Sequence, residues 1–148
     1  MSTPVLQALG VEKRYPGGVV ALRGVDLEVQ PCETLVLVGE SGCGKSTLLR
    51  LFNRLHEPTR GELFFEGARL CEVDPVALRR QIGYVQQDGG LLPHWSVARN
   101  VELVPELLGW SRERRRERGE ELLELVGLEP DRYSSRYPGE LSGGQRQR

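Results

Sequence analysis

Gly39–Thr47 reads GESGCGKST and fits the pattern G-x-x-x-x-G-K-[ST] without a mismatch. The run TLVLV at 34–38, directly before it, is apolar almost throughout and predicts a strand buried on both faces of a parallel sheet. After the loop, apolar side chains recur at helical spacing, at Leu48, Leu51, Phe52 and Leu55. The stretch therefore predicts a strand, a glycine-rich loop and a helix, in that order.

The glycine-rich loop has the chemistry of a polyphosphate site. Gly39, Gly42 and Gly44 allow backbone conformations that are closed to other residues, and they let main-chain N–H groups approach phosphate oxygens. The helix that begins near Lys45 adds unpaired N–H donors and the positive end of its dipole. Loop and helix together therefore predict the binding of a nucleotide.

The loop also supplies side chains for particular parts of a nucleotide. Lys45 is expected to reach the β and γ phosphates, Ser46 to ligate Mg²⁺ through its hydroxyl, and Thr47 to face the α phosphate. A chance match is the alternative, and the predicted strand and helix on either side argue against it. The residues predicted to line the nucleotide are Gly39, Glu40, Ser41, Gly42, Cys43, Gly44, Lys45, Ser46 and Thr47.

Composition sets the outer bounds of the interpretation. A chain of 148 residues is one domain by length, or one domain cut short. Its net charge of −1 gives no general reason to expect nucleic acid as a partner. Cys32, Cys43 and Cys71 form no metal or disulfide pattern, and Cys43 is interpreted as a small filler of the loop. No secretory signal or membrane span is recognised, so we expect any membrane role to be played through a partner.

An antiparallel β flap is predicted before the glycine-rich loop. Strand patterns run over 5–11, 19–22 and 25–29, and a turn falls at 15–18. The flap would bring Tyr15 forward, where its ring could stack on an adenine base or pack on its own hairpin. The spacing of residues does not decide between these two readings.

Between the loop and the middle of the chain, a strand at 62–65 and a short helix from Pro75 to Arg80, capped by Asp74, are predicted. A buried strand at 82–85 then delivers Gln86 and Gln87 at its carboxyl end, where ligands bind in open α/β sheets. One of these amides could orient a metal or a water molecule. Ordinary loop glutamines are the alternative.

The last third of the chain is predicted to be helical. Ser96 caps a helix that ends before Pro105, and a second helix covers 111–126 and is closed by Gly127. Arg and Glu interleave along the second helix, which favours a solvated face over a nucleic-acid patch. Its predicted buried side consists of Leu122, Leu123, Leu125 and Val126.

The chain closes on a further loop that opens a helix. Ser142, Gly143, Gly144 and Gln145 combine a capping hydroxyl with two glycines and accessible main-chain N–H groups. This turn is either a second phosphate-contacting loop or an ordinary helix cap.

GESGCGKST and the later LSGGQRQR together resemble the Walker A loop and the signature motif of the ATP-binding subunits of ABC transporters. The resemblance implies that ATP and Mg²⁺ are the cofactors and that Tyr15 stacks on adenine. It also implies that Gln87, with Gln86 as the alternative, is the glutamine that helps to hold Mg²⁺, so that Lys45 and Gln87 carry the catalytic roles. The signature residues 142–145 would then contact the γ phosphate of ATP held by a second ATP-binding subunit in a head-to-tail dimer.

A finer resemblance to the quaternary-amine uptake branch is carried by FNRLHEPTRG, IGYVQQDGGLLPHWSVARNV and VPELLGW. It implies an ATPase that powers import of an osmoprotectant such as glycine betaine or choline in a bacterium or archaeon. The partners would be a membrane permease subunit, contacted through 88–105, and indirectly a solute-binding protein. The subunit would lie at the cytoplasmic face of the membrane.

The resemblance implies an α/β fold with a P-loop NTPase core built on a parallel sheet, an N-terminal antiparallel β flap and a helical subdomain. Core and flap would occupy 1–87, and the helical subdomain 88–148. The Walker B strand, the D-loop and the switch histidine of the family are absent, since His56 and His94 both precede the signature motif. We therefore expect a partial domain that does not hydrolyse ATP by itself.

Two alternatives to a transport ATPase follow from the same residues. A truncated, non-hydrolysing remnant that binds nucleotide is the first. A soluble ABC ATPase of DNA repair is the second, and it is disfavoured because no long coiled coil separates the two motifs.

Overall fold

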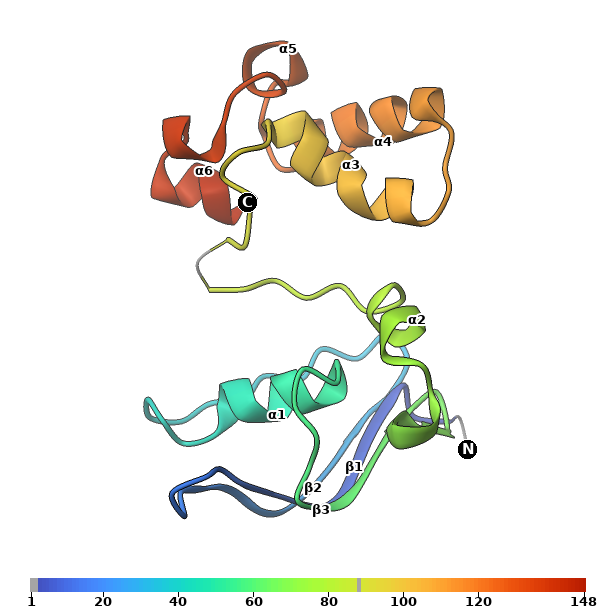
Figure 1. Cartoon of the computed structure of the whole chain (residues 1–148), viewed down its shortest axis with the longest axis vertical. Helices are drawn as coiled ribbons and strands as arrows, with labels where there is room; N and C mark the ends of the chain where they lie inside the picture. The colour runs from blue at the N-terminus through green and yellow to red at the C-terminus, as the bar shows by residue number, and fades with distance from the viewer. Residues whose placement is uncertain (1–2, 88) are drawn as a thin grey trace. The chain divides into compact units, whose positions relative to one another are not determined.

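The computed structural model describes residues 3–87 and 89–148. These residues form two compact units, Met1–Gly83 and Tyr84–Arg148, which are described separately (Figure 1). The boundary falls within the segment 82–85.

The first unit is built on an antiparallel sheet with the strand order β2-β1-β3-β4 (Figure 1). Ala8 of β1 pairs with Leu27 of β2 on one side and with Leu63 of β3 on the other. The predicted antiparallel flap is confirmed, with 19–22 and 25–29 joined into one strand whose register shifts along its length. The strands are β1 (Leu6–Arg14), β2 (Val20–Val29), β3 (Arg60–Phe65) and β4 (Ala68–Arg69).

Helix α1 (Lys45–Phe52) follows the glycine-rich loop and packs on this sheet (Figure 1). Leu48, Leu51 and Phe52 are buried in the same cluster as Ala8 and Leu63, because their helical spacing puts them on one face. Leu55 does not belong to that face and is 46% exposed, since the helix ends at Phe52. The short elements η1 (Leu70–Glu72) and α2 (Pro75–Arg79) complete the unit, with Asp74 capping α2 as predicted.

The parallel sheet that was predicted around the loop is not formed in the described residues. The segments 34–38 and 82–85 carry no strand, and Val36 and Val38 are 72% and 88% exposed. A strand requires a neighbouring strand for its N–H and C=O groups. The four strands of the described chain pair only with one another, so these two apolar segments have no strand to pair with there.

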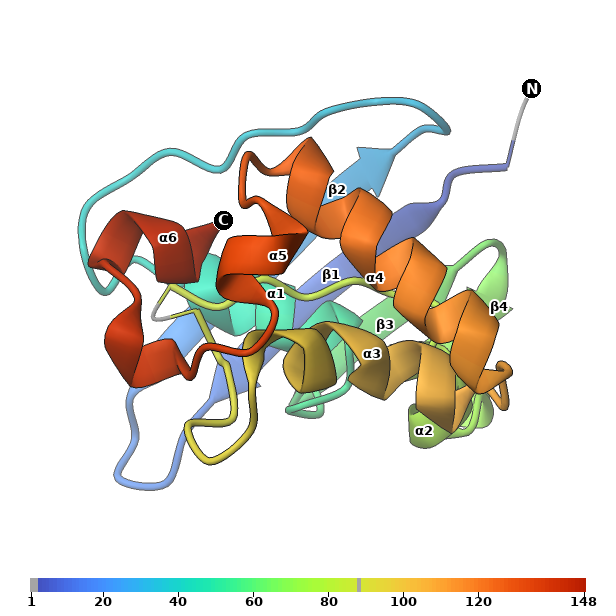
Figure 2. The same cartoon turned by 90° about the horizontal axis from the view of Figure 1, so that it is seen from above.

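The second unit is helical, and α3 and α4 lie side by side in it (Figure 2). Ser96 caps α3 as predicted. Ser111, which was predicted only as the first residue of the second helix, caps α4, and each hydroxyl accepts a hydrogen bond from the third backbone N–H beyond it. The core contains Val97, Leu123, Leu128, Tyr133 and Leu141. The elements are α3 (Val97–Leu107), α4 (Arg112–Leu125), α5 (Pro130–Tyr133), η2 (Pro138–Glu140) and α6 (Gly143–Gln147).

Two helix predictions in this unit were wrong in detail. Helix α3 continues through Pro105 to Leu107, and the carbonyl oxygen of Pro105 accepts a hydrogen bond from the Trp110 N–H. Proline removes only its own N–H group, so one further turn could form on carbonyls that remain available. Leu125 is 80% exposed and not buried, because it lies in the last turn of α4 on the opposite side from Leu123.

The charged face of α4 is a solvated one, as predicted. Arg116 pairs with Glu120 and Arg118 with Glu121, each at 2.8 Å and at helical spacing. The hydrogen bond and charge of Glu120 raise the pKa of Arg116. A backbone hydrogen bond and then the Ser111 hydroxyl lower the pKa of the Glu113 carboxyl.

Candidate functional site

The glycine-rich loop connects the exposed segment 34–38 to α1 and has the backbone that its glycines were predicted to allow. Gly39, Gly42 and Gly44 have φ angles of 155°, 83° and 102°, a region that other residues seldom adopt. The Cys43 N–H donates to the Glu40 carbonyl at 3.3 Å and closes a turn in the middle of the loop.

Two of these glycines also make approaches that a side chain would block. A Cβ on Gly44 would lie 2.5 Å from the Ala21 carbonyl oxygen and 2.9 Å from Leu22 Cδ2, both in β2. A Cβ on Gly39 would lie 2.7 Å from Cys43 Sγ. The small Cys43 side chain therefore packs against Gly39 inside the loop. At Gly44 the main chain of the loop packs directly on β2 of the antiparallel sheet.

Lys45 folds back over the loop. Its ammonium donates to the carbonyl oxygens of Gly39 and Glu40, both at 2.7 Å, and lies 3.4 Å from Cys43 Sγ. A single positive charge is thus held at the mouth of the loop, at the start of α1, where the helix adds the positive end of its dipole. The arrangement can hold an anion between main-chain N–H groups and an ammonium group.

Ser46 and Thr47 follow Lys45 in the first turn of α1. The Ser46 hydroxyl is exposed, and it has no hydrogen-bond partner among the residues that the structure describes. The Thr47 hydroxyl lies 3.4 Å from the hydroxyl of Tyr15. The structure therefore brings the predicted adenine-stacking residue next to the phosphate loop.

Tyr15 is held at the tip of the β1–β2 hairpin, where its N–H donates to the Val19 carbonyl at 2.9 Å. The side chain of Lys13 places its ammonium over the ring at 5.3 Å, and the ring of His56 meets it at 88° with centroids 5.7 Å apart. Both readings of Tyr15 are compatible with this geometry, because the ring packs on its hairpin and also faces α1. Its role in stacking stays a prediction.

A magnesium ion fits the first turn of α1 in its donor chemistry. Mg²⁺ takes oxygen ligands and is often bound by one or two protein groups plus phosphate oxygens. The free hydroxyl of Ser46 meets that need, with the Gln87 amide as the second predicted ligand. Within residues 3–87 and 89–148, no group of three or more His, Cys, Asp or Glu could hold a metal by itself. Bound phosphates would therefore supply much of the coordination.

Gln87 belongs to the second unit, where it lies beside the signature residues. It lines a cavity of about 300 Å³ together with Gly89, Gly143, Arg146 and Gln147. A Cβ on Gly89 would lie 2.9 Å from the Arg146 carbonyl oxygen, so the two segments approach closely. The Gln86 side chain lies close to Gly90, because a Cβ on Gly90 would lie 3.3 Å from the amide carbon of Gln86. Gln87 is thus placed with α6, and its pairing with Ser46 stays a prediction.

The signature residues form a helix cap. The Ser142 hydroxyl accepts from the Gln145 N–H at 3.2 Å, and the Gln145 side chain accepts from the Ser142 N–H at 2.9 Å. The Gln145 amide also donates to the Tyr133 hydroxyl at 3.0 Å, which joins the cap to α5. Gly143 and Gly144 are exposed, and a Cβ on either would meet nothing within 4 Å. The predicted cap is confirmed, while its predicted contact with a phosphate is not tested by this geometry.

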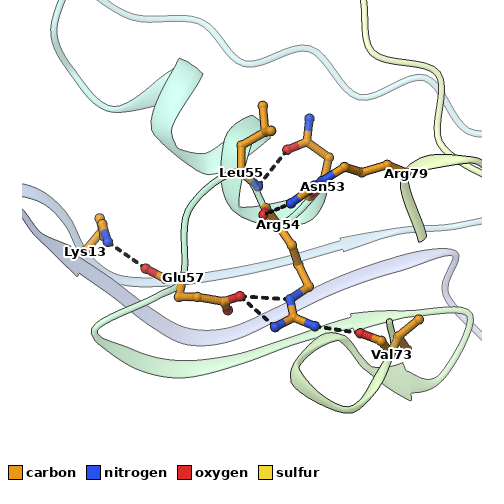
Figure 3. A network of polar contacts seen from close by, with 7 residues as sticks. All are labelled: Lys13, Asn53, Arg54, Leu55, Glu57, Val73 and Arg79. Atoms are coloured by element: carbon orange, nitrogen blue, oxygen red, sulfur yellow. Dashed lines mark hydrogen bonds and ion pairs between the residues drawn. The ribbon is translucent and has the colours of Figure 1, made fainter. Parts of the chain in front are cut away.

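A polar network fixes the other end of α1 (Figure 3). Arg79 of α2 donates to the carbonyl oxygens of Asn53 and Arg54 at 3.0 and 2.6 Å. Arg54, with a φ of 52°, pairs with Glu57 at 2.7 Å and donates to the Val73 carbonyl at 2.6 Å. Sequence reasoning did not identify this network, because all of its acceptors except the Glu57 carboxylate are backbone carbonyl oxygens, which carry no side-chain pattern.

Among the helices of the described residues, none has both the length and the apolar character that crossing a membrane requires.

The comparisons with known proteins agree with this geometry. Residues 22–148 match the family described as ABC transporter. The chain is 50% identical over 138 residues to the glycine betaine/carnitine/choline transport ATP-binding protein OpuCA of Bacillus subtilis, covering 93% of this chain and 36% of that protein. It is 49% identical over 138 residues to the choline transport ATP-binding protein OpuBA of the same organism, with the same two coverages. The chain thus spans about a third of the length of these curated relatives.

Solved structures show the same relationship. The dimeric, post-hydrolysis ATP-binding cassette MJ0796 bound to ADP and Pi is 35% identical, with a TM-score of 0.86, and the match covers 95% of this chain and 65% of that one. The Clostridium perfringens protein cbiO1, part of the ABC transporter complex cbiONQ, is 26% identical with a TM-score of 0.83. That match covers 99% of this chain and 59% of cbiO1.

Proposed function

This chain belongs to the ABC transporter family, and we propose that it is part of an ATP-binding subunit that hydrolyses ATP to power import of a quaternary-amine osmoprotectant such as glycine betaine or choline. The observation that supports the nucleotide site is the loop 39–47, in which three glycines have positive φ angles and the Lys45 ammonium lies on the loop carbonyls at the start of α1. The proposed cargo is supported by the names of the similar B. subtilis proteins, which are transport ATP-binding proteins for choline, or for glycine betaine, carnitine and choline.

The proposed chemistry is phosphoryl transfer to water. Catalysis of this reaction consists mainly of positioning and of stabilising negative charge on the γ phosphate. Main-chain N–H groups of the loop would hold the phosphates, and Lys45 would leave the carbonyls of Gly39 and Glu40 to neutralise the β and γ oxygens. Bound Mg²⁺ would neutralise further charge, with Ser46 and Gln87 as its protein ligands. Tyr15 would stack on the adenine.

The proposed partners are a second ATP-binding subunit and a membrane permease. Gly143 and Gly144 are exposed at the start of α6, and this supports a contact between the signature residues and a nucleotide held by another subunit. The dimer of MJ0796 and the cbiONQ complex that contains cbiO1 are consistent with such an assembly. The subunit would act at the cytoplasmic face of the membrane, with a solute-binding protein delivering the cargo to the permease.

Replacing Lys45 tests the nucleotide site. Lys45→Ala is expected to abolish tight MgATP binding in titration calorimetry, because it removes the ammonium group that contacts the loop carbonyls. Arg23→Ala is the matched control, since Arg23 is exposed in β2 and its loss lowers the charge of the same unit equally. Unchanged MgATP binding by Lys45→Ala would defeat the assignment. Uptake of labelled choline and glycine betaine by the whole transporter would test the cargo.

A further inference from the structure

We propose that His56 and Lys13 are positioning residues for the Tyr15 ring and thereby set how strongly the site prefers a purine nucleotide over a bare polyphosphate. This inference rests on the proposed function, because it assumes that Tyr15 stacks on the base. It concerns contacts that lie outside the glycine-rich loop.

The Tyr15 ring is contacted from three elements of the first unit. Its hydroxyl lies 3.4 Å from the Thr47 hydroxyl of α1, and the Lys13 ammonium of β1 lies over the ring at 5.3 Å. The ring of His56, in the connection after α1, stands at 88° to it. An edge-to-face pair of aromatic rings at this separation is favourable. Together the three contacts oppose rotation of the ring.

Lys13 and His56 are themselves held by the connection that follows α1. Lys13 donates to the Glu57 carbonyl at 2.7 Å, and the Glu57 carboxylate accepts from Arg54 at 2.7 Å (Figure 3). The His56 N–H donates to the Arg50 carbonyl at 3.3 Å, in the last turn of α1. Hydrogen bonds therefore hold the Lys13 ammonium to the connection after α1 and the His56 backbone to the last turn of α1.

A fixed ring binds a base more tightly than a mobile one. Stacking immobilises a side chain, and a ring that is already immobile loses less conformational freedom on binding. Because the Lys13 ammonium covers one ring face, the opposite face is the one assigned to the base. Loss of either support would weaken the contact with the base and leave the contacts with the phosphates unchanged.

The test compares MgATP with magnesium tripolyphosphate, which lacks a base, by titration calorimetry on the full chain. His56→Ala is expected to lower the affinity for MgATP about threefold to tenfold, the size of one aromatic pair contact. Its affinity for tripolyphosphate should stay within about twofold of the wild-type value. His56→Phe keeps an aromatic ring at the position and should restore MgATP binding.

Lys13→Met provides a second variant that keeps the length of the side chain and removes the ammonium. It should show the same selective loss for MgATP, and circular dichroism will show that each variant is folded. His94→Ala is the control, because His94 belongs to the second unit, where its ring pairs with that of Trp95.

Each outcome has a distinct meaning. Unchanged MgATP affinity in both His56→Ala and Lys13→Met, or an equal loss for MgATP and tripolyphosphate, would overturn the positioning role. Failure of the wild-type chain to bind either ligand, or full binding by Lys45→Ala, would instead overturn the nucleotide site on which the inference rests.

Discussion

Substitution of Gly44 by alanine tests how the phosphate loop is seated. The φ of Gly44 is 102°, and a non-glycine residue in that region costs about 1–2 kcal/mol. The new Cβ would also lie 2.5 Å from the Ala21 carbonyl oxygen, so the main chain of β2 or the start of α1 must move. Such overpacking adds about 1–3 kcal/mol, and the expected total is about 2–5 kcal/mol of lost stability.

Gly42→Ala is the matched control for this prediction. Gly42 has a φ of 83°, but a Cβ there would meet nothing within 4 Å. Only the backbone term applies, so we expect a loss of about 1–2 kcal/mol. Urea unfolding followed by circular dichroism measures both variants. Equal losses of unfolding free energy in the two variants would refute the reasoning, because they would show that a Cβ on Gly44 is tolerated next to β2 without additional cost.

Two other predictions concern polar contacts that fix the ends of helices. Arg79→Ala should lower the free energy of unfolding by about 1 kcal/mol, because the carbonyls of Asn53 and Arg54, just after α1, lose two partly exposed hydrogen bonds. Arg80→Ala removes an exposed neighbour and should change the free energy of unfolding little. Asn100→Ala should speed hydrogen exchange at the Leu92 amide several-fold, because the Asn100 side chain accepts from the Leu92 N–H at 2.7 Å and donates to three carbonyls around that loop. Unchanged unfolding of Arg79→Ala, or unchanged exchange at Leu92, would count against the respective contact.

Local signals in the sequence predicted local structure well. The caps at Asp74 and Ser96 were predicted from residue type and position, a cap at Ser142 was one of two readings, and each of the three side chains accepts the expected backbone hydrogen bond. A cap depends only on residues within one turn, so it can be read without knowledge of the tertiary fold. The antiparallel flap was predicted for the same reason, since a hairpin pairs neighbouring segments.

Predictions that depend on distant partners were less reliable. The run 34–38 has the composition of a buried strand, but composition cannot supply the neighbouring strand that it needs. The contacts of His56 with Tyr15 also join residues far apart in the chain. His56 lies within FNRLHEPTRG, a string quoted for its family resemblance, yet nothing in that string indicates which side chain it touches.

Contacts of α1, and not the strand that was predicted before the loop, hold the phosphate loop in its position. At its first end, α1 rests on β2 through Gly44, and its buried face, including Leu51, packs on the antiparallel sheet. Just beyond its other end, Arg79 donates to the carbonyl oxygens of Asn53 and Arg54, and Lys13 donates to the Glu57 carbonyl oxygen. A helix held at both ends keeps its first N–H groups in a constant direction. The loop can therefore present its donors to an anion although the segment 34–38 forms no strand.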